Sequence, residues 1–218
     1  MKGRKFKDAM YNGFAKLLKA ISNPSRLEII EMLSQGEKSV ESIAQTTSLT
    51  IANASQHLQV LKNNNIVKIR KEKQYVYYSL ISDDFLSVYQ HVIHYATHEI
   101  AELEKIMNRQ RQDNNAQNAV SLEELERMVK SDNVMLLDVR PSSEFESGHI
   151  TGAISFPMNE LIANLKNFNM DKEIIAYCRG PFCVLADEAV RLLKENGYQV
   201  RRLDEGYPEW KIKQTISI

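Results

Sequence analysis

The apolar residues of this chain follow one pattern before residue 109 and another after residue 119. In the first part they recur three and four positions apart, which is the period of amphipathic helices. In the second part, short apolar runs such as VMLLDV (134–139) and EIIAYC (173–178) alternate with helical stretches. The stretch between them, RQRQDNNAQNA, is polar and has no apolar period. The pattern predicts a mainly helical domain over 1–108, a linker over 109–119 and a parallel-sheet α/β domain over 120–218.

Helix-start signals and apolar spacing organise the first part. Asn23 and Pro24 predict a cap and a first helical residue, and a helix with Leu27, Ile30 and Leu33 on one face follows. A short helical stretch, SVESIAQTT, leads through a turn into IANASQHLQVLKNNN. The spacing in this last helix predicts one buried stripe, formed by Ile51, Ala54, Leu58 and Leu61.

The opposite face of that last helix carries amide side chains near its N-terminal end. At about 100° per residue, Gln56 lies opposite the stripe and Asn53 lies within about 60° of opposite. Asn and Gln can bond bidentately to adenine in the major groove of DNA. Two helices joined by a short turn, the second with such a face, predict a helix-turn-helix.

A β-hairpin with a basic tip is predicted directly after this helix. IVKIRKEKQYVYYSL is rich in β-forming residues and carries Arg70, Lys71 and Lys73 at its centre. The tip suits contact with DNA phosphates, and the alternative is an ordinary solvated hairpin.

Three segments resemble the ArsR-type winged helix-turn-helix repressors: LKAISNPSRLEIIEML, SQHLQVLKNNNIV and YVYYSL. The resemblance covers about residues 8–100. It implies a homodimer that represses by binding an inverted-repeat DNA operator. By position it also implies two groups of DNA-binding residues, which are Thr50, Asn53, Ser55, Gln56 and His57 in or beside the groove, and Arg70, Lys71 and Lys73 in the wing.

A helix over 84–108 is predicted to hold the dimer together and raises the question of a metal site. Its apolar stripe is the expected seam and comprises Phe85, Val88, Val92, Ala96, Ile100, Leu103 and Met107. Many members of the resembled family release DNA when they bind metal. Some bind it through cysteines in the helix before the recognition helix, and this chain has no cysteine there. Others use an Asp-x-His pair from one chain and His-x-x-His or His-x-x-Glu from the other. Of that second pattern this chain has only the histidine half, in His91 and His94, with His98 one turn on. We therefore expect solvated histidines, no metal and no cofactor.

The run YCRGPFC holds both cysteines of the chain, at the end of a predicted buried strand and before a predicted helix. Unpaired N–H groups and the helix dipole favour an anion there, so they lower the pKa of a thiol. A thiolate at Cys178 would be a competent nucleophile, and the alternative is an inert buried cysteine. Asp138 ends another predicted strand, where it either takes part in catalysis or bonds to nearby loop amides.

The second part resembles a single-domain rhodanese through LLDVRPSSEFESGHITGAISFP, IIAYCRGPFC and LDEGYPEW, over about residues 120–215. The resemblance implies a sulfurtransferase in which Cys178 carries sulfur as a persulfide. It also implies that backbone N–H groups from Arg179 to Cys183, including those of Gly180 and Phe182, cradle the sulfur. Arg179 would then meet the sulfonate of a donor such as thiosulfate.

Two residues near Cys178 refine the expected chemistry. Phosphatases that share the rhodanese fold need an arginine six positions after the cysteine, and this chain has Val184 there. Phosphoryl transfer would therefore lack its bidentate clamp. Cys183 either attacks a persulfide on Cys178 as a resolving thiol or fills a small buried position.

The bulk composition agrees with these patterns. Residues 1–80 hold 13 Lys and Arg against 6 Asp and Glu, a net charge of +7 that suits a polyanion, and the remainder carries −7. Two cysteines in 218 residues suit a reducing compartment, and no apolar run approaches the roughly 20 residues that span a bilayer. We expect a cytoplasmic protein without membrane contact.

Together the patterns predict a winged helix-turn-helix (α+β, mainly α) followed by an α/β rhodanese domain. The expected function is a DNA-binding transcriptional repressor whose second domain senses or carries reactive sulfur through a Cys178 persulfide. Its expected partners are a double-stranded operator, a second copy of the chain and a small sulfur donor such as thiosulfate or a persulfide. Two alternatives stay open: a working thiosulfate-type sulfurtransferase that uses DNA binding for autoregulation, and a metal-responsive repressor.

Overall fold

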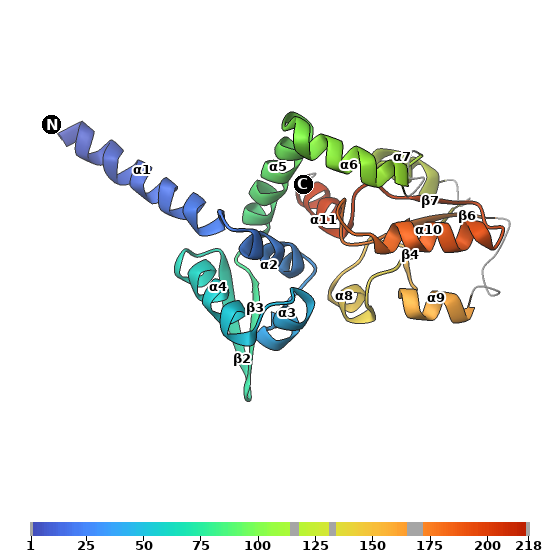
Figure 1. Cartoon of the computed structure of the whole chain (residues 1–218), viewed down its shortest axis with the longest axis horizontal. Helices are drawn as coiled ribbons and strands as arrows, with labels where there is room; N and C mark the ends of the chain where they lie inside the picture. The colour runs from blue at the N-terminus through green and yellow to red at the C-terminus, as the bar shows by residue number, and fades with distance from the viewer. Residues whose placement is uncertain (1, 114–117, 131–133, 165–171, 217–218) are drawn as a thin grey trace. The chain divides into compact units, whose positions relative to one another are not determined.

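A computed structural model describes residues 2–113, 118–130, 134–164 and 172–216. The chain divides into two compact units, Met1–Leu86 and Ser87–Ile218, as the colours of Figure 1 help to follow. The first is mainly helical with a small antiparallel sheet, and the second contains a parallel sheet with helices. The predicted fold class is confirmed.

Helices surround a small antiparallel sheet in the first unit. Its elements are α1 (Lys2–Ile21), α2 (Pro24–Ser34), β1 (Lys38–Ser39), α3 (Val40–Thr46), α4 (Ile51–Asn63), β2 (Val67–Glu72) and β3 (Tyr75–Leu80). The sheet order is β1-β3-β2, and β2 and β3 form the predicted hairpin, whose turn contains Lys73 at φ 54°.

Side-chain caps set the starts of the helices. Asn23 accepts a hydrogen bond from the Arg26 N–H at the start of α2. Ser39 accepts one from the Ser42 N–H at the start of α3. Thr50 caps α4 by accepting from the Asn53 N–H at 3.2 Å. The turn between α3 and α4 passes through Ser48, at φ 56°.

Three of the four residues predicted to form the buried stripe of α4 are buried. Ala54, Leu58 and Leu61 are fully buried, but Ile51 is 56% exposed. Ile51 is the first residue of the helix, so its side chain lies over the preceding turn and not over the core.

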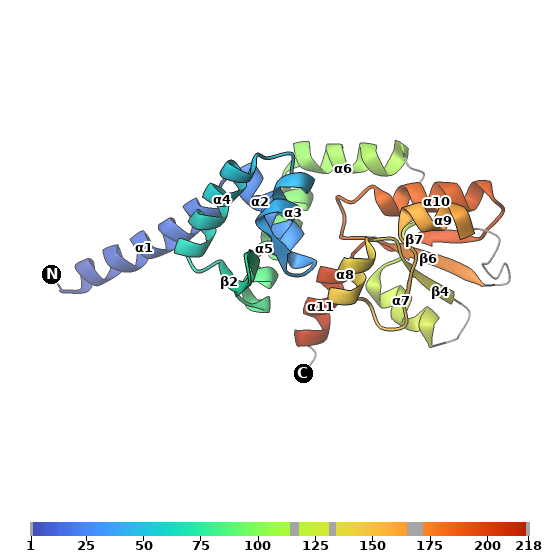
Figure 2. The same ribbon diagram turned by 90° about the horizontal axis from the view of Figure 1, so that it is seen from below.

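The predicted helix over 84–108 is in fact two helices, α5 (Asp83–Glu99) and α6 (Ala101–Asp113), which meet at Ile100. Figures 1 and 2 show the chain changing direction there. Thr97 explains the break, because its hydroxyl donates to the carbonyls of Ile93 and His94, both at 3.0 Å. Such back-bonding bends helices. The first five residues of the predicted linker belong to α6, and residues 114–117 lie outside the described part.

The second unit continues with a parallel sheet of order β5-β4-β6-β7. Its elements are α7 (Leu122–Val129), β4 (Val134–Asp138), α8 (Ser142–Ser147), β5 (Ile154–Ser155), α9 (Met158–Asn164), β6 (Glu173–Tyr177), α10 (Leu185–Glu195), β7 (Val200–Arg202) and α11 (Tyr207–Ile216). One core cluster joins the sheet to α10 and another joins it to α7.

The register of the central strands places two functional candidates at one edge. Asp138 of β4 pairs with Tyr177 of β6, so Asp138 and Cys178 both lie at the carboxyl ends of neighbouring parallel strands. Functional groups of open α/β sheets gather at this edge. Among the described residues, no helix is both long and apolar enough to cross a bilayer.

Candidate DNA-binding surface and candidate thiol site

The N-terminal half of α4 presents the predicted DNA-binding residues on one side. Asn53, Ser55 and Gln56 are exposed, and His57 is half-buried. Thr50 is also exposed, although its hydroxyl is already occupied as the cap of the helix. The face opposite the buried residues of α4 is therefore polar and rich in amides, as expected from the sequence.

The wing divides into paired and unpaired cations. Arg70 forms ion pairs with Glu37 and Glu72, both at 2.6 Å, and its guanidinium lies 4.7 Å from the ring centre of Tyr77. The hydrogen bonds that Arg70 donates to Glu37, and then the one to Glu72, raise the pKa of Arg70. Lys71 and Lys73 are exposed at the hairpin tip. The net positive charge of the tip therefore comes from the two lysines.

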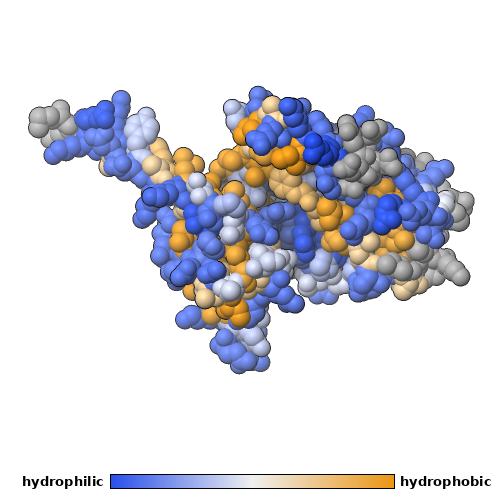
Figure 3. Space-filling view, viewed as in Figure 1, coloured by the Kyte–Doolittle hydropathy of each residue, from blue (hydrophilic) through white to orange (hydrophobic). Residues whose placement is uncertain are grey.

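Apolar side chains are exposed along α1, a surface that was not predicted. Phe6 and Tyr11 are each 67% exposed, Phe14 is 52% exposed and Leu18 is 58% exposed. Figure 3 shows apolar surface on this helix. The spacing of these residues was the available signal, because they recur at helical intervals.

The predicted dimer seam on α5 and α6 is also largely exposed in the single chain. Val88 is 56% exposed, Val92 and Ile100 are each 45% exposed, and Leu103 is 37% exposed. Phe85, Ala96 and Met107 are partly buried. Figure 3 shows apolar surface on α6 as well.

The three histidines of α5 are exposed. The Nδ1 atom of His91 lies 2.7 Å from the Ser87 carbonyl, and that of His98 lies 2.8 Å from the His94 carbonyl. The rings of His94 and His98 are 4.1 Å apart. Among the described residues, no three or more His, Cys, Asp or Glu side chains are grouped to hold a metal ion.

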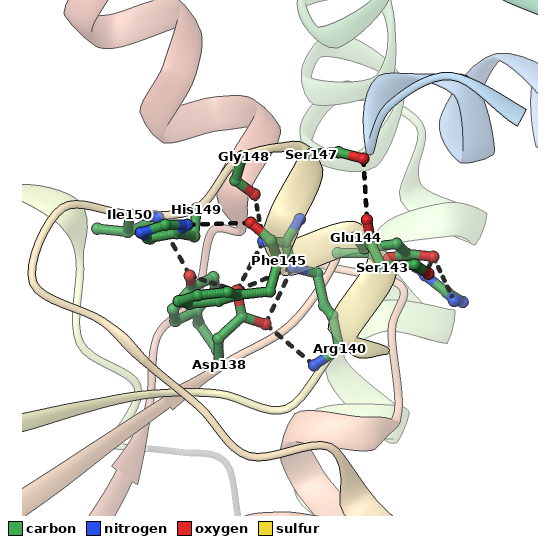
Figure 4. A network of polar contacts seen from close by, with 11 residues as sticks. Asp138, Arg140, Ser143, Glu144, Phe145, Ser147, Gly148, His149 and Ile150 are labelled. Carbon is green, nitrogen blue, oxygen red and sulfur yellow. Dashed lines mark hydrogen bonds and ion pairs between the residues drawn. The ribbon is translucent and has the colours of Figure 1, made fainter.

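Asp138 lies at the centre of a buried polar network (Figure 4). It is fully buried and accepts hydrogen bonds from the Arg140 backbone N–H at 3.0 Å and from its guanidinium at 2.6 Å. The Tyr177 hydroxyl also donates to Asp138 and accepts from the Ile150 N–H. Burial, with the Asp138 charge, raises the pKa of Tyr177. Because Arg140 also donates to the Gly148 carbonyl, the network ties β4 to the following loop and fits the structural alternative for Asp138.

The two cysteines are joined in a disulfide in this structure. Cys178 follows β6, Cys183 lies two residues before α10, and their Cα atoms are 6.2 Å apart. Cys178 is buried and Phe182 is 43% exposed. The Cys183 N–H donates to the Gly180 carbonyl at 3.2 Å, so in this form it stabilises the turn. One of the amides expected to cradle the Cys178 sulfur is therefore occupied elsewhere.

Arg179 lies next to the disulfide, but a carboxylate compensates its charge. Its guanidinium binds Glu144 through Nη2 at 2.8 Å and Nε at 2.9 Å, and Glu144 is only 3% exposed. The resemblance to rhodaneses implied that Arg179 meets the sulfonate of a donor; its partner Glu144, which lies 35 residues earlier, was not predicted. To meet an anion, Arg179 would have to leave Glu144 or share its charge.

Other residues support the thiol loop from the C-terminal segment and were not predicted. Arg202 donates to the carbonyls of Gly180 and Pro181, both at 3.2 Å. Gly206 packs so closely on the loop that a Cβ there would lie 2.5 Å from the Arg179 carbonyl carbon. Glu209 accepts from the Gly206 N–H at 2.9 Å and from the Gln90 side chain at 3.1 Å. The sequence of β7, VRR, did not tell the buried Arg202 from the neighbouring Arg201.

Two family models match the chain, one for each part. The model described as "Bacterial regulatory protein, arsR family" matches residues 23–68, and the one described as "Rhodanese-like domain" matches residues 121–213. The chain belongs to the arsR family of bacterial regulatory proteins and carries a rhodanese-like domain. It is an ArsR-type DNA-binding transcriptional regulator with a rhodanese domain, as the sequence motifs predicted.

Individual proteins resemble the chain over its whole length or over one part. The HTH-type transcriptional regulator Rv0324 of Mycobacterium tuberculosis is 36% identical over 210 residues, which cover 94% of this chain and 90% of that protein. The thiosulfate sulfurtransferase GlpE of Shewanella oneidensis is 27% identical over 92 residues, or 42% of this chain and 89% of that protein. A solved winged helix-turn-helix domain of Mb0332 from Mycobacterium bovis, described as homodimeric, is 33% identical. The matched region covers 44% of this chain and 89% of that domain, and the TM-score is 0.42.

Proposed function

We propose that the protein is a repressor that senses reactive sulfur, and that the state of Cys178 and Cys183 sets its affinity for DNA. The observation that carries this proposal is the pairing of the two thiols within one loop, with Cα atoms 6.2 Å apart. This separation lies within the range that a disulfide needs. The loop ends at the start of an 11-residue helix, α10, whose dipole favours a thiolate or persulfide anion over the neutral form.

The proposed reaction begins with both cysteines reduced. The Cys178 thiolate attacks the outer sulfur of a low-molecular-weight persulfide, RSSH. A Cys178–S–SH persulfide forms and RSH leaves, after taking up a proton. The Cys183 thiolate then attacks the Cys178 Sγ and displaces hydrosulfide. Overall the protein dithiol loses two electrons to form the disulfide, and the transferred sulfur gains them and leaves as H₂S.

The environment of Arg179 favours a persulfide donor over thiosulfate. A thiosulfate dianion would need a cation beside Cys178, and the Arg179 guanidinium is held by Glu144. A persulfide carries at most one negative charge and needs no clamp for a sulfonate. The cradle of loop amides remains part of the proposal for the reduced form.

The DNA-binding half of the proposal uses the exposed side of α4 and the lysines of the wing. Amide side chains at Asn53 and Gln56 would contact base edges, with Thr50, Ser55 and His57 beside them. Lys71 and Lys73 would contact phosphates. Two copies of the chain would bind an inverted repeat, with the exposed apolar faces of α5 and α6 at the dimer seam.

A short chain of contacts offers a route from the thiol loop to α5 within the unit Ser87–Ile218. The carboxylate of Glu209 lies beside Gly180, at 3.5 Å from the point that a Cβ would occupy there, and it binds the Gly206 N–H. The same carboxylate accepts a hydrogen bond from Gln90 of α5. A change in the loop would therefore reach a residue of the proposed dimer helix through one carboxylate. A differential free energy of about 1 to 3 kcal/mol would change operator affinity about 5- to 150-fold.

The test measures operator affinity against the state of the thiols. A duplex selected from random sequence with the reduced protein is titrated by fluorescence anisotropy, before and after treatment with glutathione persulfide. We expect weaker binding by the treated wild type and no change in Cys178→Ser, with mass spectrometry to report the disulfide. Gln90→Ala should form the disulfide and still respond less. Equal affinities of treated and untreated wild type would refute sensing.

A working sulfurtransferase is the second candidate, favoured by the match of residues 121–213 to the rhodanese-like domain model. Steady turnover of thiosulfate with cyanide or a thiol as acceptor would support it. A single stoichiometric modification of Cys178 without turnover would support sensing instead.

A further inference from the structure

We propose that Arg202 is the positioning residue of the thiol pair: clamped by Asp187, it fixes the backbone of the 178–183 loop so that Cys183 stays within reach of Cys178. This inference deepens the proposed function and rests on it. Arg202 does not touch the sulfur atoms in this role. It acts through the peptide groups between the two cysteines.

The register of the sheet places Arg202 on the same face as Cys178. Arg202 of β7 pairs with Ala176 of β6, and Cys178 follows Ala176 by two residues. Side chains two positions apart along an extended segment point to the same side. Both Arg202 (6% exposed) and Asp187 (5% exposed) are buried, so this cation lies beneath the loop and away from solvent.

The guanidinium of Arg202 is saturated by partners from three segments. Its Nη1 donates to both oxygens of Asp187, at 2.9 and 3.0 Å, which anchors it to the first turn of α10. Its Nη2 donates to the Gly180 and Pro181 carbonyls, each at 3.2 Å. Its Nε lies 3.3 Å from the Leu203 carbonyl. The planar fork of an arginine can satisfy such a set, whereas the point charge of a lysine cannot.

Fixing these two carbonyls orients the rest of the loop. The peptide bonds of the described residues are trans, so a carbonyl held on the Arg202 side directs the N–H of the same peptide to the other side. Pro181 has no N–H, which leaves the Phe182 N–H as the amide oriented by the clamp on the Pro181 carbonyl. Cys183 comes next and closes the turn through its bond to the Gly180 carbonyl. Two of the carbonyls on the path from Cys178 to Cys183 are therefore held by one side chain.

Loss of the clamp should widen the range of loop conformations and lower the effective concentration of the Cys183 thiol at Cys178. We expect a drop of about tenfold, which for a two-electron couple raises the reduction potential of the disulfide by about 30 mV. The rate at which Cys183 resolves a Cys178 persulfide should fall by a similar factor. A merely structural residue would change stability and leave the potential of the folded protein where it was.

The experiment uses the full chain, equilibrated in glutathione redox buffers and read by mass spectrometry after alkylation. Arg202→Met is paired with Asp187→Leu so that no buried carboxylate is left alone, and Arg202→Lys is the conservative variant. The control is Arg201→Met, because Arg201 is the neighbouring residue of β7 but binds Glu173 at 2.6 Å and Glu124 at 2.8 Å. Circular dichroism and thermal unfolding establish that each variant is folded.

We expect the double variant to shift the thiol–disulfide equilibrium about tenfold towards the dithiol, Arg202→Lys at least threefold, and Arg201→Met less than twofold. Folded Arg202 variants with the wild-type equilibrium would overturn the inference alone. If the double variant does not fold, Arg202→Lys decides the matter by the same threefold criterion. A wild type that forms no disulfide with glutathione persulfide would overturn the proposed function, and the inference with it.

Discussion

The wing offers the sharpest quantitative prediction, because its cations differ in how they are paired. Replacing Lys73 with Ala removes an exposed charge from the hairpin tip, whereas replacing Arg70 with Ala removes a charge that Glu37 and Glu72 already compensate. Each phosphate contact contributes about 0.9 to the slope of log K against log salt concentration, and a dimer has two wings. Lys73→Ala should therefore reduce the slope by about 1.8.

That slope is measurable as a change in affinity over a modest range of salt. Between 50 and 200 mM KCl, a slope of 1.8 corresponds to a change of about 12-fold in the binding constant. Fluorescence anisotropy with the selected duplex should show that the wild type loses about 12-fold more affinity than Lys73→Ala across this range. Arg70→Ala should change the slope by less than a third as much, and Glu72→Gln should raise affinity at 50 mM KCl. If Arg70→Ala and Lys73→Ala reduce the slope equally, the assigned difference between paired and unpaired cations is wrong.

Three further predictions concern the rhodanese domain. Glu144→Gln leaves Arg179 without its carboxylate, so the rate constant for sulfur transfer from thiosulfate should rise about tenfold in a cyanide assay, unless Arg179 has no part in donor binding. Asp138→Asn leaves Arg140 buried without its counter-charge, and urea unfolding should show the domain destabilised by about 3 to 5 kcal/mol; a loss below 1 kcal/mol would contradict the buried pair. Burial raises the pKa of Glu205 above its ordinary 4.5, so ionised Glu205 opposes folding at neutral pH. Glu205→Gln should therefore be more stable than the wild type at pH 7, and the gain should disappear as the pH falls below 4.5; an equal difference at both pH values would argue against this cause.

Local patterns were sufficient to predict most of the helices and strands around the two sites. The amide-rich side of α4 followed from helical spacing alone, because Ala54, Leu58 and Leu61 define the buried side. The break at Ile100 did not, because the apolar stripe continues through it and the Thr97 back-bonding that bends the helix leaves no trace in the period. The prediction that Ile51 is buried was wrong for a related reason: helical spacing does not distinguish a residue in the first turn from one in the middle of the helix.

The partners of the thiol loop could not be predicted, since they come from distant parts of the chain. Glu144 precedes Arg179 by 35 residues, and Arg202 follows Gly180 by 22. These residues meet because the helix and the loops that follow the parallel strands gather at one edge of the sheet. The cysteines themselves were visible as a motif because the loop that holds them is continuous in sequence.

The disulfide encloses a very short stretch, since its cysteines are five positions apart. A cross-link of this size removes little freedom from the unfolded chain, worth about 2 kcal/mol on the chain-entropy model, against about 4.7 kcal/mol for a loop of 100 residues. The remainder of the domain is held by its four-stranded sheet and by two apolar clusters, one of which includes Cys178 itself. Opening a cross-link of this size should therefore cost the domain little stability, as the reversible change of thiol state proposed above requires.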